Sequence, residues 1–174
     1  NLYGRQEVGS PIIDENTVGI LTSRNVTIDA TNGDAIFGSS YIPLIESGNG
    51  YTVEFSVDVS GNPDGDPGIE IDTANTAVLV QVVPDKCQVY GPSIGSTYEF
   101  ATPSNGHDIF WRFTVDGVGR VRLYRDGVEV TSAETITLAV VADIPHPRVL
   151  WWGEAGSLSV WKALRIFRGG AVAP

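Results

Sequence analysis

Two closely spaced carboxylates are the first residues in this chain whose types and spacing suggest chemistry. Glu70 and Asp72 alternate with isoleucines in the segment Gly68-Ile69-Glu70-Ile71-Asp72, which places both acids on one face of a strand. Retaining hydrolysis of a glycosidic bond needs a nucleophilic carboxylate and a second carboxylic acid about 5 Å away. Residue 74, the next position on that face, is alanine, so the strand supplies no acid/base partner for Glu70. The simpler interpretation is a strand end that exposes two acids.

Oxygen-bearing side chains gathered in one acidic loop are the second candidate. They are Asp58, Asn62, Asp64 and Asp66. Calcium takes several hard oxygen ligands, and alternate acidic residues in a glycine-rich loop can converge on one ion. The glycine spacing differs from that of a calcium loop, and no glutamate closes the segment at the expected distance. Two interpretations stay open: a calcium site, with calcium as the one cofactor we expect, or a solvated turn of the residues that dominate turns.

An aromatic and arginine set is the third candidate, as a ligand-binding site. It consists of Trp152, Tyr124, Arg122, Arg112 and Glu154. Sugars bind by stacking on aromatic rings beside a few polar anchors. Trp151 and Trp152 are adjacent, so on a strand they point to opposite faces, and alternation with Val149 puts Trp151 inside. The alternative is a solvated sheet face on which arginine stems cover apolar area.

Composition narrows the class of protein. The chain has 174 residues, of which 42% are hydrophobic and 18% charged, and this predicts one globular domain over residues 1–174, with an arm at 1–9 and a tail at 169–174. A net charge of -10 argues against nucleic acid and anionic membranes as partners. The longest apolar run is far too short to insert into a membrane.

Cys87 is the single cysteine, and we expect a buried, inert thiol. The absence of methionine, even at position 1, suggests a processed product or an excised domain.

Alternation of apolar and polar residues predicts the elements that position these side chains. Residues 109–115 and 121–124 alternate on either side of Asp116-Gly117, which predicts a hairpin with one buried face. A second Asp-Gly pair, Asp126-Gly127, predicts a third strand at residues 128–130. In this pattern Arg112, Arg122 and Tyr124 share the outward face of the hairpin.

The rest of the chain shows further short strands and no helical period. The predicted strands cover residues 11–13, 18–21, 26–28, 35–37, 51–59, 69–72, 76–83, 86–90, 97–100, 135–141, 148–152 and 157–167, the last with a bulge near Lys162. Many short strands separated by turn residues are typical of an all-β, two-sheet antiparallel sandwich. The sequence leaves open whether residues 1–30 pair within this domain or with a partner.

Four segments resemble the concanavalin A-like lectin/glucanase superfamily, in particular its laminin-G-like and pentraxin-like jelly rolls. They are Phe37-Gly38-Ser39-Ser40-Tyr41-Ile42-Pro43-Leu44 with the strand from Tyr51, Trp111-Arg112-Phe113-Thr114-Val115-Asp116-Gly117, Val121-Arg122-Leu123-Tyr124-Arg125-Asp126-Gly127, and Trp151-Trp152-Gly153 with residues 159–167. The resemblance implies a jelly roll of two antiparallel sheets. It also implies that Glu70 and Asp72 match part of the catalytic strand of the retaining glucanases, whose last acid is missing here.

Three functional hypotheses follow from these patterns. The first is a non-catalytic module that binds carbohydrate or a protein surface, as part of a larger extracellular, cell-surface or virion protein. The second is a structural or adhesion domain of a phage tail, fibre or capsid-decoration protein, in which the chain forms oligomers or joins neighbouring domains. The third is a glycoside hydrolase, which depends on Glu70 and Asp72. Fold alone does not choose among them.

Overall fold

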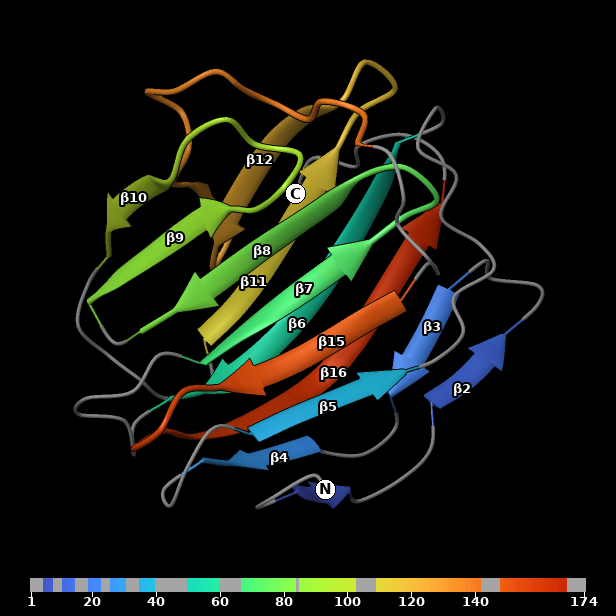
Figure 1. The fold of residues 1–174 in the computed structure, drawn as a ribbon, viewed down its shortest axis with the longest axis vertical. Helices are drawn as coiled ribbons and strands as arrows, with labels where there is room; N and C mark the ends of the chain where they lie inside the picture. The colour runs from blue at the N-terminus through green and yellow to red at the C-terminus, as the bar shows by residue number, and fades with distance from the viewer. Residues whose placement is uncertain are drawn as a thin grey trace.

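The computed structural model describes residues 5–7, 11–14, 19–22, 26–30, 35–39, 50–59, 67–83, 85–102, 109–141 and 148–168. Its strands form two antiparallel sheets that lie one in front of the other (Figure 1). The predicted all-β, two-sheet antiparallel sandwich is therefore confirmed. The concanavalin A-like superfamily stays a prediction. No part of the chain that the structure describes forms a helix long and apolar enough to cross a membrane.

The larger sheet has ten strands. Its main order is β1 (Arg5–Glu7), β4 (Val26–Asp29), β16 (Leu158–Arg168), β6 (Tyr51–Asp58), β11 (Ile109–Val115), β12 (Arg120–Arg125) and β13 (Val128–Glu129). In addition, β3 (Gly19–Thr22) pairs with β16 and with β2 (Pro11–Asp14), and β14 (Ile136–Thr137) pairs with β12. The described strands among the first thirty residues thus join this sheet, and within the predicted arm Arg5–Glu7 pairs with β4.

The smaller sheet has six strands and lies nearer the viewer in Figure 1. Its order is β10 (Tyr98–Ala101), β9 (Lys86–Tyr90), β8 (Ala77–Val82), β7 (Pro67–Asp72), β15 (Arg148–Gly153) and β5 (Ala35–Ser39). Neighbours β7 and β15 are far apart in the sequence, and so are β15 and β5. This order places β15, the second-to-last strand, between two strands that come much earlier in the sequence.

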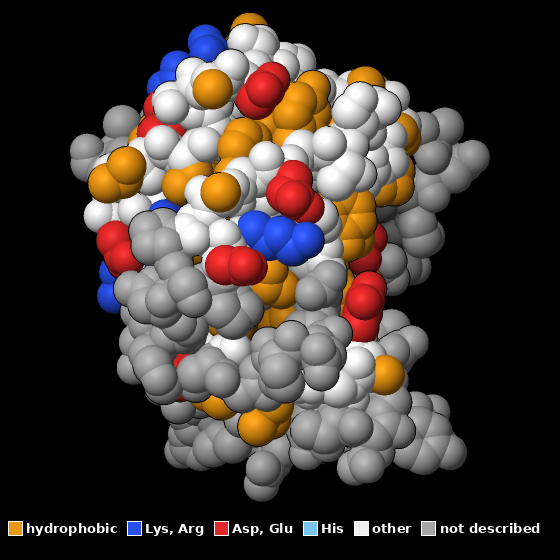
Figure 2. All heavy atoms as spheres, turned by 90° about the vertical axis from the view of Figure 1, so that its left-hand side faces the viewer, with side chains coloured by type: hydrophobic (Ala, Val, Ile, Leu, Met, Phe, Trp, Pro, Cys, Tyr) orange, Lys and Arg blue, Asp and Glu red, His pale blue; other side chains and the backbone are white. Residues whose placement is uncertain are grey.

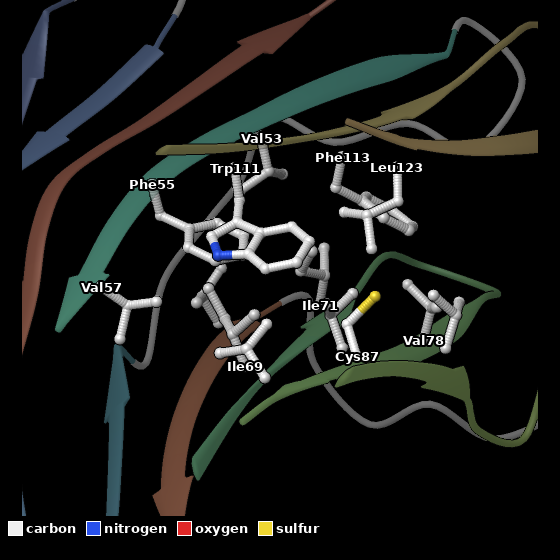
Figure 3. Packing of buried hydrophobic residues seen from close by; sticks show 14 of the residues in the cluster. Val53, Phe55, Val57, Ile69, Ile71, Val78, Cys87, Trp111, Phe113 and Leu123 are labelled. Atoms are coloured by element: carbon white, nitrogen blue, oxygen red, sulfur yellow. The ribbon is translucent and has the colours of Figure 1, made fainter. Parts of the chain in front are cut away.

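Alternate residues of both sheets meet in one hydrophobic core. In Figure 3 the β6 side chains Val53 and Phe55 lie beside Trp111, opposite Ile69 and Ile71 of β7. Trp111, Trp151 and Trp161 are buried, Trp151 as predicted, and full burial of one large apolar side chain stabilises the fold by roughly 1.5–3 kcal/mol. Cys87 is buried in the same cluster, and this burial raises the pKa of its thiol to about 12. The thiol therefore stays protonated and inert at neutral pH.

The predicted central hairpin is observed, and its register pairs Trp111 with Arg125 and Val115 with Val121. Its connecting loop is longer than the Asp-Gly pair alone. The Asp116 carboxylate accepts hydrogen bonds from the backbone N–H groups of Val118, at 3.0 Å, and Arg120, at 2.8 Å. The positive φ falls on Gly119, at 83°.

The second Asp-Gly pair forms a tight turn. Asp126 and Gly127 have φ values of 47° and 83°, as a two-residue hairpin turn requires. The turn leads into the predicted third strand, which is observed as β13.

The strand predicted at residues 135–141 is wrong for most of its length. Only Ile136–Thr137 is a strand. Beyond it, the backbone N–H groups of residues 138, 139 and 141 donate to the carbonyls of Gly119, Ser93 and Asn75. These acceptors lie on three different segments. Residues 138–141 therefore pass from one segment to the next instead of pairing with one partner strand. The predicted bulge in the last strand is confirmed, because the pairing of β16 with β6 shifts register between Lys162 and Arg165.

Candidate functional site

The outer face of the six-stranded sheet carries two neighbouring rows of side chains. Strand pairing aligns Trp152, Gly68, Gln81, Gln88 and Glu99 in one row across β15, β7, β8, β9 and β10. It aligns Leu150, Glu70, Leu79 and Tyr90 in the next row. Because successive strand residues alternate between faces, both rows face away from the core that their sequence neighbours fill. The sheet therefore presents aromatic, amide and carboxylate groups on one surface.

The Trp152 indole lies directly over Gly68. A Cβ atom at residue 68 would lie 2.1 Å from Cζ2 and 2.2 Å from Cη2 of the ring, which is far inside van der Waals contact. Any side chain at this position would force the indole away from the sheet. Trp151 is 1% exposed, whereas Trp152 is partly exposed, so the predicted orientation of both tryptophans is confirmed. The glycine thus makes room for an aromatic platform.

A pocket of about 290 Å³ opens on this face. Its lining residues are Glu70, Leu79, Tyr90, Leu150, Trp152, Gly153 and Glu154. Small-molecule sites span roughly 300–1,000 Å³, so this pocket has the size of a site for one compact group. Aromatic and aliphatic walls with two carboxylates are the composition expected of a binding site with a few polar anchors.

A short turn after β15 places Glu154 at the pocket. The Glu154 carbonyl accepts a hydrogen bond from the Ser157 backbone N–H at 3.0 Å, and Gly156 N–H donates to the Ala30 carbonyl at 2.8 Å. Gly156 has a φ of 95°, a conformation that glycine adopts without strain. The turn is therefore held by backbone bonds, and the exposed Glu154 side chain is free of any structural role in closing it.

The predicted ligand-binding set is divided between two surfaces. Trp152 and Glu154 line the pocket, whereas Arg112, Arg122 and Tyr124 lie on β11 and β12 of the other sheet. Their alternation with buried Trp111 and Leu123 turns them to the outer face of the ten-stranded sheet. The outer faces of two packed sheets look in opposite directions, so one small ligand does not contact all five side chains.

Arg112 is held by an ion pair. Its Nε donates to Oε1 of Glu54 at 2.8 Å, and its Nη2 lies 2.6 Å from the same oxygen. Arg165 Nη1 approaches Oε2 of Glu54 at 3.8 Å. Only 7% of the Glu54 side chain and 19% of the Arg112 side chain are exposed. Arg112 thus neutralises a buried carboxylate.

Tyr124 and Arg122 contact each other. Tyr124 is only 6% exposed and pairs in register with Arg112 and Glu129. A hydrogen bond to Tyr124 raises the pKa of the Arg122 guanidinium. This region fits the alternative interpretation of a sheet face that arginine side chains cover.

The predicted calcium ligands lie mostly outside the described residues. Asp58, at the end of β6, is partly exposed and pairs in register with Val160, whereas Asn62, Asp64 and Asp66 fall in the segment that is not described. Among the described side chains, no three acidic, histidine or cysteine groups cluster as a metal site requires. Calcium stays a prediction.

The two acids of β7 have different environments, contrary to the expectation of two exposed carboxylates. Glu70 lines the pocket, whereas Asp72 is 2% exposed. A second carboxylate does stand in the pocket, but it belongs to Glu154 after the neighbouring strand. Sequence reasoning also missed Gly68, Leu79 and Tyr90. Leu79 and Tyr90 were recognisable as outward positions of the predicted strands 76–83 and 86–90. Only the strand order shows that these positions lie beside Glu70.

The edge of the sandwich at β9 and β10 carries exposed charged side chains. Figure 2 faces this side of the molecule and shows acidic and basic side chains interspersed with hydrophobic ones over its described surface. Lys86 and Glu99 form an ion pair there at 3.2 Å, with 39% and 53% of their side chains exposed. Exposed pairs of this kind contribute little binding energy.

Comparison with known proteins shows similarity in fold only. No protein-family model matches the sequence, and none of the curated proteins matches it. Similar solved structures are receptor-binding domains of botulinum neurotoxins. The type G receptor-binding domain has a TM-score of 0.56 at 8% identity, over 94% of this chain and 44% of that one.

Two further neurotoxin structures are similar to the same extent. The binding domain of botulinum neurotoxin DC in complex with SialylT has a TM-score of 0.56 at 10% identity, over 95% of this chain and 43% of that one. A structure of type C, whose cell entry depends upon interaction with two ganglioside molecules, has a TM-score of 0.52 at 13% identity, over 95% and 43%. This chain spans less than half the length of these proteins.

Proposed function

We propose that this chain is a non-catalytic carbohydrate-binding module whose ligand occupies the pocket on the outer face of the six-stranded sheet. The observation that carries the proposal is the Trp152 indole, which lies over Gly68 and forms one wall of that pocket. Tryptophan side chains are highly buried on average. Here the sequence instead provides a glycine that supports the ring at the surface.

The chemistry of the pocket suits a sugar ring. The C–H face of a pyranose stacks on the indole, and its hydroxyl groups donate to the carboxylates of Glu70 and Glu154. Beyond Gly68 the same row continues with Gln81, which is only 6% exposed, and with the partly exposed Gln88. Apolar contact with a few polar anchors provides both affinity and orientation.

We place the module in a larger extracellular, cell-surface or virion protein. The similar folds are receptor-binding domains that are more than twice as long as the part this chain covers. Their gangliosides and SialylT are ligands of those proteins, and identities of 8–13% transfer no site residue to this chain.

One observation favours glycoside hydrolysis as a second candidate function. Glu70 and Glu154 line the same pocket, so the second carboxylate that β7 lacks is supplied by the turn after β15. Two carboxylates about 5 Å apart support retention and wider pairs support inversion. Release of reducing ends from bound oligosaccharides, abolished by Glu70→Gln, is the result that would replace binding by catalysis.

A glycan array on the purified chain, run with calcium and again with a chelator, tests the proposal. We expect hits that Trp152→Ala abolishes and that Trp152→Phe, which keeps an aromatic ring, retains in part. Arg122→Ala on the opposite sheet is the matched control and should leave the hits unchanged. Hits that vanish with the chelator would add calcium to the site.

Two outcomes would overturn the proposal. Hits that survive Trp152→Ala but disappear in Arg122→Ala would move the site to the ten-stranded sheet. An array without hits in either condition would favour the structural or adhesion domain, and the oligomeric state of the chain would then be measured.

A further inference from the structure

We propose that the pocket prefers saccharides that carry a methyl group, either in a 6-deoxyhexose or in an N-acetylated amino sugar, over the parent sugars that carry a hydroxyl group in the same place. This inference depends on the proposed carbohydrate-binding function and narrows its ligand class. It starts from the apolar side chains of Leu79, Leu150 and Trp152, which line the pocket.

The two leucines stand on either side of one strand. Residue 70 of β7 pairs in register with Leu150 of β15 on one side and with Leu79 of β8 on the other. Neighbouring strands lie about 4.8 Å apart, so the backbones at the two leucines are about 10 Å apart. Both side chains line the pocket, and a leucine side chain neither donates nor accepts a hydrogen bond. Two walls of the pocket are therefore purely apolar.

Two glycines allow apolar side chains to lie low on this face of the sheet. The Trp152 indole covers Gly68, and Leu79 lies over Gly91 in a similar way, because a Cβ atom at residue 91 would be 2.7 Å from Leu79 Cδ1. Gly91 has a φ of 128°, which residues with a side chain rarely adopt. A side chain at either glycine would displace its apolar neighbour, so both glycines preserve the apolar surface of the pocket.

A methyl group and a hydroxyl group meet this surface with different free energies. A methyl group that leaves water for contact with leucine and tryptophan gains the hydrophobic free energy of its buried area. A hydroxyl group in the same position gives up its hydrogen bonds to water and finds no partner on a leucine side chain. Because the gain and the penalty favour the same ligand, the pocket distinguishes two sugars that differ at one position.

The polar residues of the pocket do not create this preference. Glu70 and Tyr90 each already interact with another group of the protein, so the methyl preference depends on neither of them. The Glu154 side chain is exposed, and an ionised carboxylate accepts hydrogen bonds from hydroxyl groups and from acetamido N–H groups alike. Glu154 therefore orients either kind of sugar, and the apolar walls distinguish between them.

An NMR titration of the folded chain with six free sugars tests the inference. They are glucose, 6-deoxyglucose and N-acetylglucosamine, and the three corresponding sugars of the galactose series. The shift of the Trp152 indole N–H, assigned with Trp152→Phe, reports binding at the pocket. We expect the 6-deoxy or the N-acetyl sugar to bind at least about fourfold more tightly than its parent, which corresponds to about 0.8 kcal/mol and to burial of one methyl-sized group. Which of the two binds more tightly distinguishes the sources of the methyl group.

Matched variants test whether the leucines cause the preference. Leu79→Asn keeps a side chain of similar size but supplies a donor and an acceptor for a hydroxyl group, so it should remove the preference. Leu150→Asn makes the same change on the opposite side of β7 and should have the same effect. Leu158→Asn, at an exposed position on β16 of the other sheet, is the control and should leave the preference unchanged.

The outcomes separate this inference from the function on which it rests. Equal or tighter binding of the parent sugars, lost in Trp152→Ala, would overturn the methyl preference and keep the carbohydrate site. A preference that survives both Leu79→Asn and Leu150→Asn would also overturn it. If none of the six sugars shifts the indole signal, array hits confined to glycans with methyl-bearing residues would support the preference, and hits on glycans without them would overturn it. An array without hits would overturn both proposals.

Discussion

The outer faces of the two sheets are both formed by strands in which apolar and polar residues alternate. The centres of the two faces nevertheless differ in what their side chains contact. On the ten-stranded sheet, Glu54 and Arg112 satisfy each other across β6 and β11, and Tyr124 beside them is 6% exposed. On the six-stranded sheet, the corresponding centre holds Gly68 under the Trp152 ring, with a pocket beside it. The centre of the first face is a pair of charged groups bound to each other, whereas the centre of the second is a pocket with aromatic and carboxylate walls.

The difference shows why an outward position does not by itself make a binding residue. Arg112, Arg122 and Tyr124 have the side chains expected of a sugar site, but each of them contacts a neighbour on its own sheet. Trp152 is outward in the same sense, and of its two neighbours in register, Gly68 and Ile36, one is a glycine. The cross-strand partner, which is a property of strand order, decides which of the two outcomes occurs.

We call the outer face of the ten-stranded sheet the closed face and that of the six-stranded sheet the open face. The largest effect we expect comes from breaking the ion pair between Glu54 and Arg112 on the closed face. Glu54→Ala would leave Arg112 largely buried without its counter-charge, which costs about 3 kcal/mol of unfolding free energy. Urea unfolding of the purified variant measures this loss. Ligand binding by the folded fraction should not change, because the pocket lies on the other sheet.

Two matched variants make this test specific to the pair. Glu54→Ala combined with Arg112→Met removes both charges and should recover much of the stability. Arg165→Ala should cost less than about 1 kcal/mol, as expected for an exposed ion pair, because 50% of that side chain is exposed and its nitrogen lies 3.8 Å from Glu54. A loss for Arg165→Ala as large as that for Glu54→Ala would contradict our account of the closed face.

The fold was predictable from the sequence to a larger extent than the site. Alternation alone predicted the core positions of β6, β11 and β12, the orientation of Trp151 and Trp152, and the bulge after Lys162, because each depends on neighbours along one strand. It failed at residues 138–141, whose hydrogen bonds go to Gly119, Ser93 and Asn75. Those bonds depend on which segments meet at the end of the sandwich.

The candidate site, like residues 138–141, depends on which segments meet in the folded chain. Trp152 and Glu154 were named from residue type, but their association with Glu70, Leu79 and Tyr90 follows from the order β9, β8, β7, β15. No local pattern fixes that order, because β7 and β15 are separated by residues 73–147. The role of Gly68 was hidden for the same reason.

The next largest effect should be a loss of ligand affinity when one methyl group is added at residue 68 on the open face. Gly68→Ala places a Cβ where the Trp152 ring lies, at 2.1 Å from Cζ2, so the ring must leave its position. We expect the affinity for the array ligand to fall about tenfold or more, which corresponds to about 1.4 kcal/mol. Titration of the ligand and near-ultraviolet circular dichroism of the tryptophans would measure the two consequences.

A double variant shows whether the glycine acts through the ring. With Trp152 already replaced by alanine, Gly68→Ala should produce no further loss of the residual affinity, which titration at high ligand concentration measures below the detection limit of the array. An additional loss of the same size would mean that Gly68 contributes to binding independently of the indole. Gly127→Ala is not a suitable control because of its φ of 83°, whereas Gly95→Ala is, since a Cβ there meets nothing within 4 Å and no positive φ is required.

The smallest effect should come from the exposed carboxylate at the edge of the six-stranded sheet. Hydrogen bonds from Gln88 and Lys86 lower the pKa of Glu99 from its ordinary value of 4.5. A carboxyl group with a depressed pKa in the folded state contributes stability above the unfolded pKa and loses it as pH falls through the folded value. The sign is therefore stabilising at pH 7, but water screens a pair in which 53% of the Glu99 side chain is exposed. We expect Glu99→Gln to leave the urea midpoint unchanged at pH 7 and at pH 3.

A drop at pH 7 comparable to that of Glu54→Ala would show that exposure does not separate the two carboxylates, and would remove the physical basis for contrasting the closed and open faces.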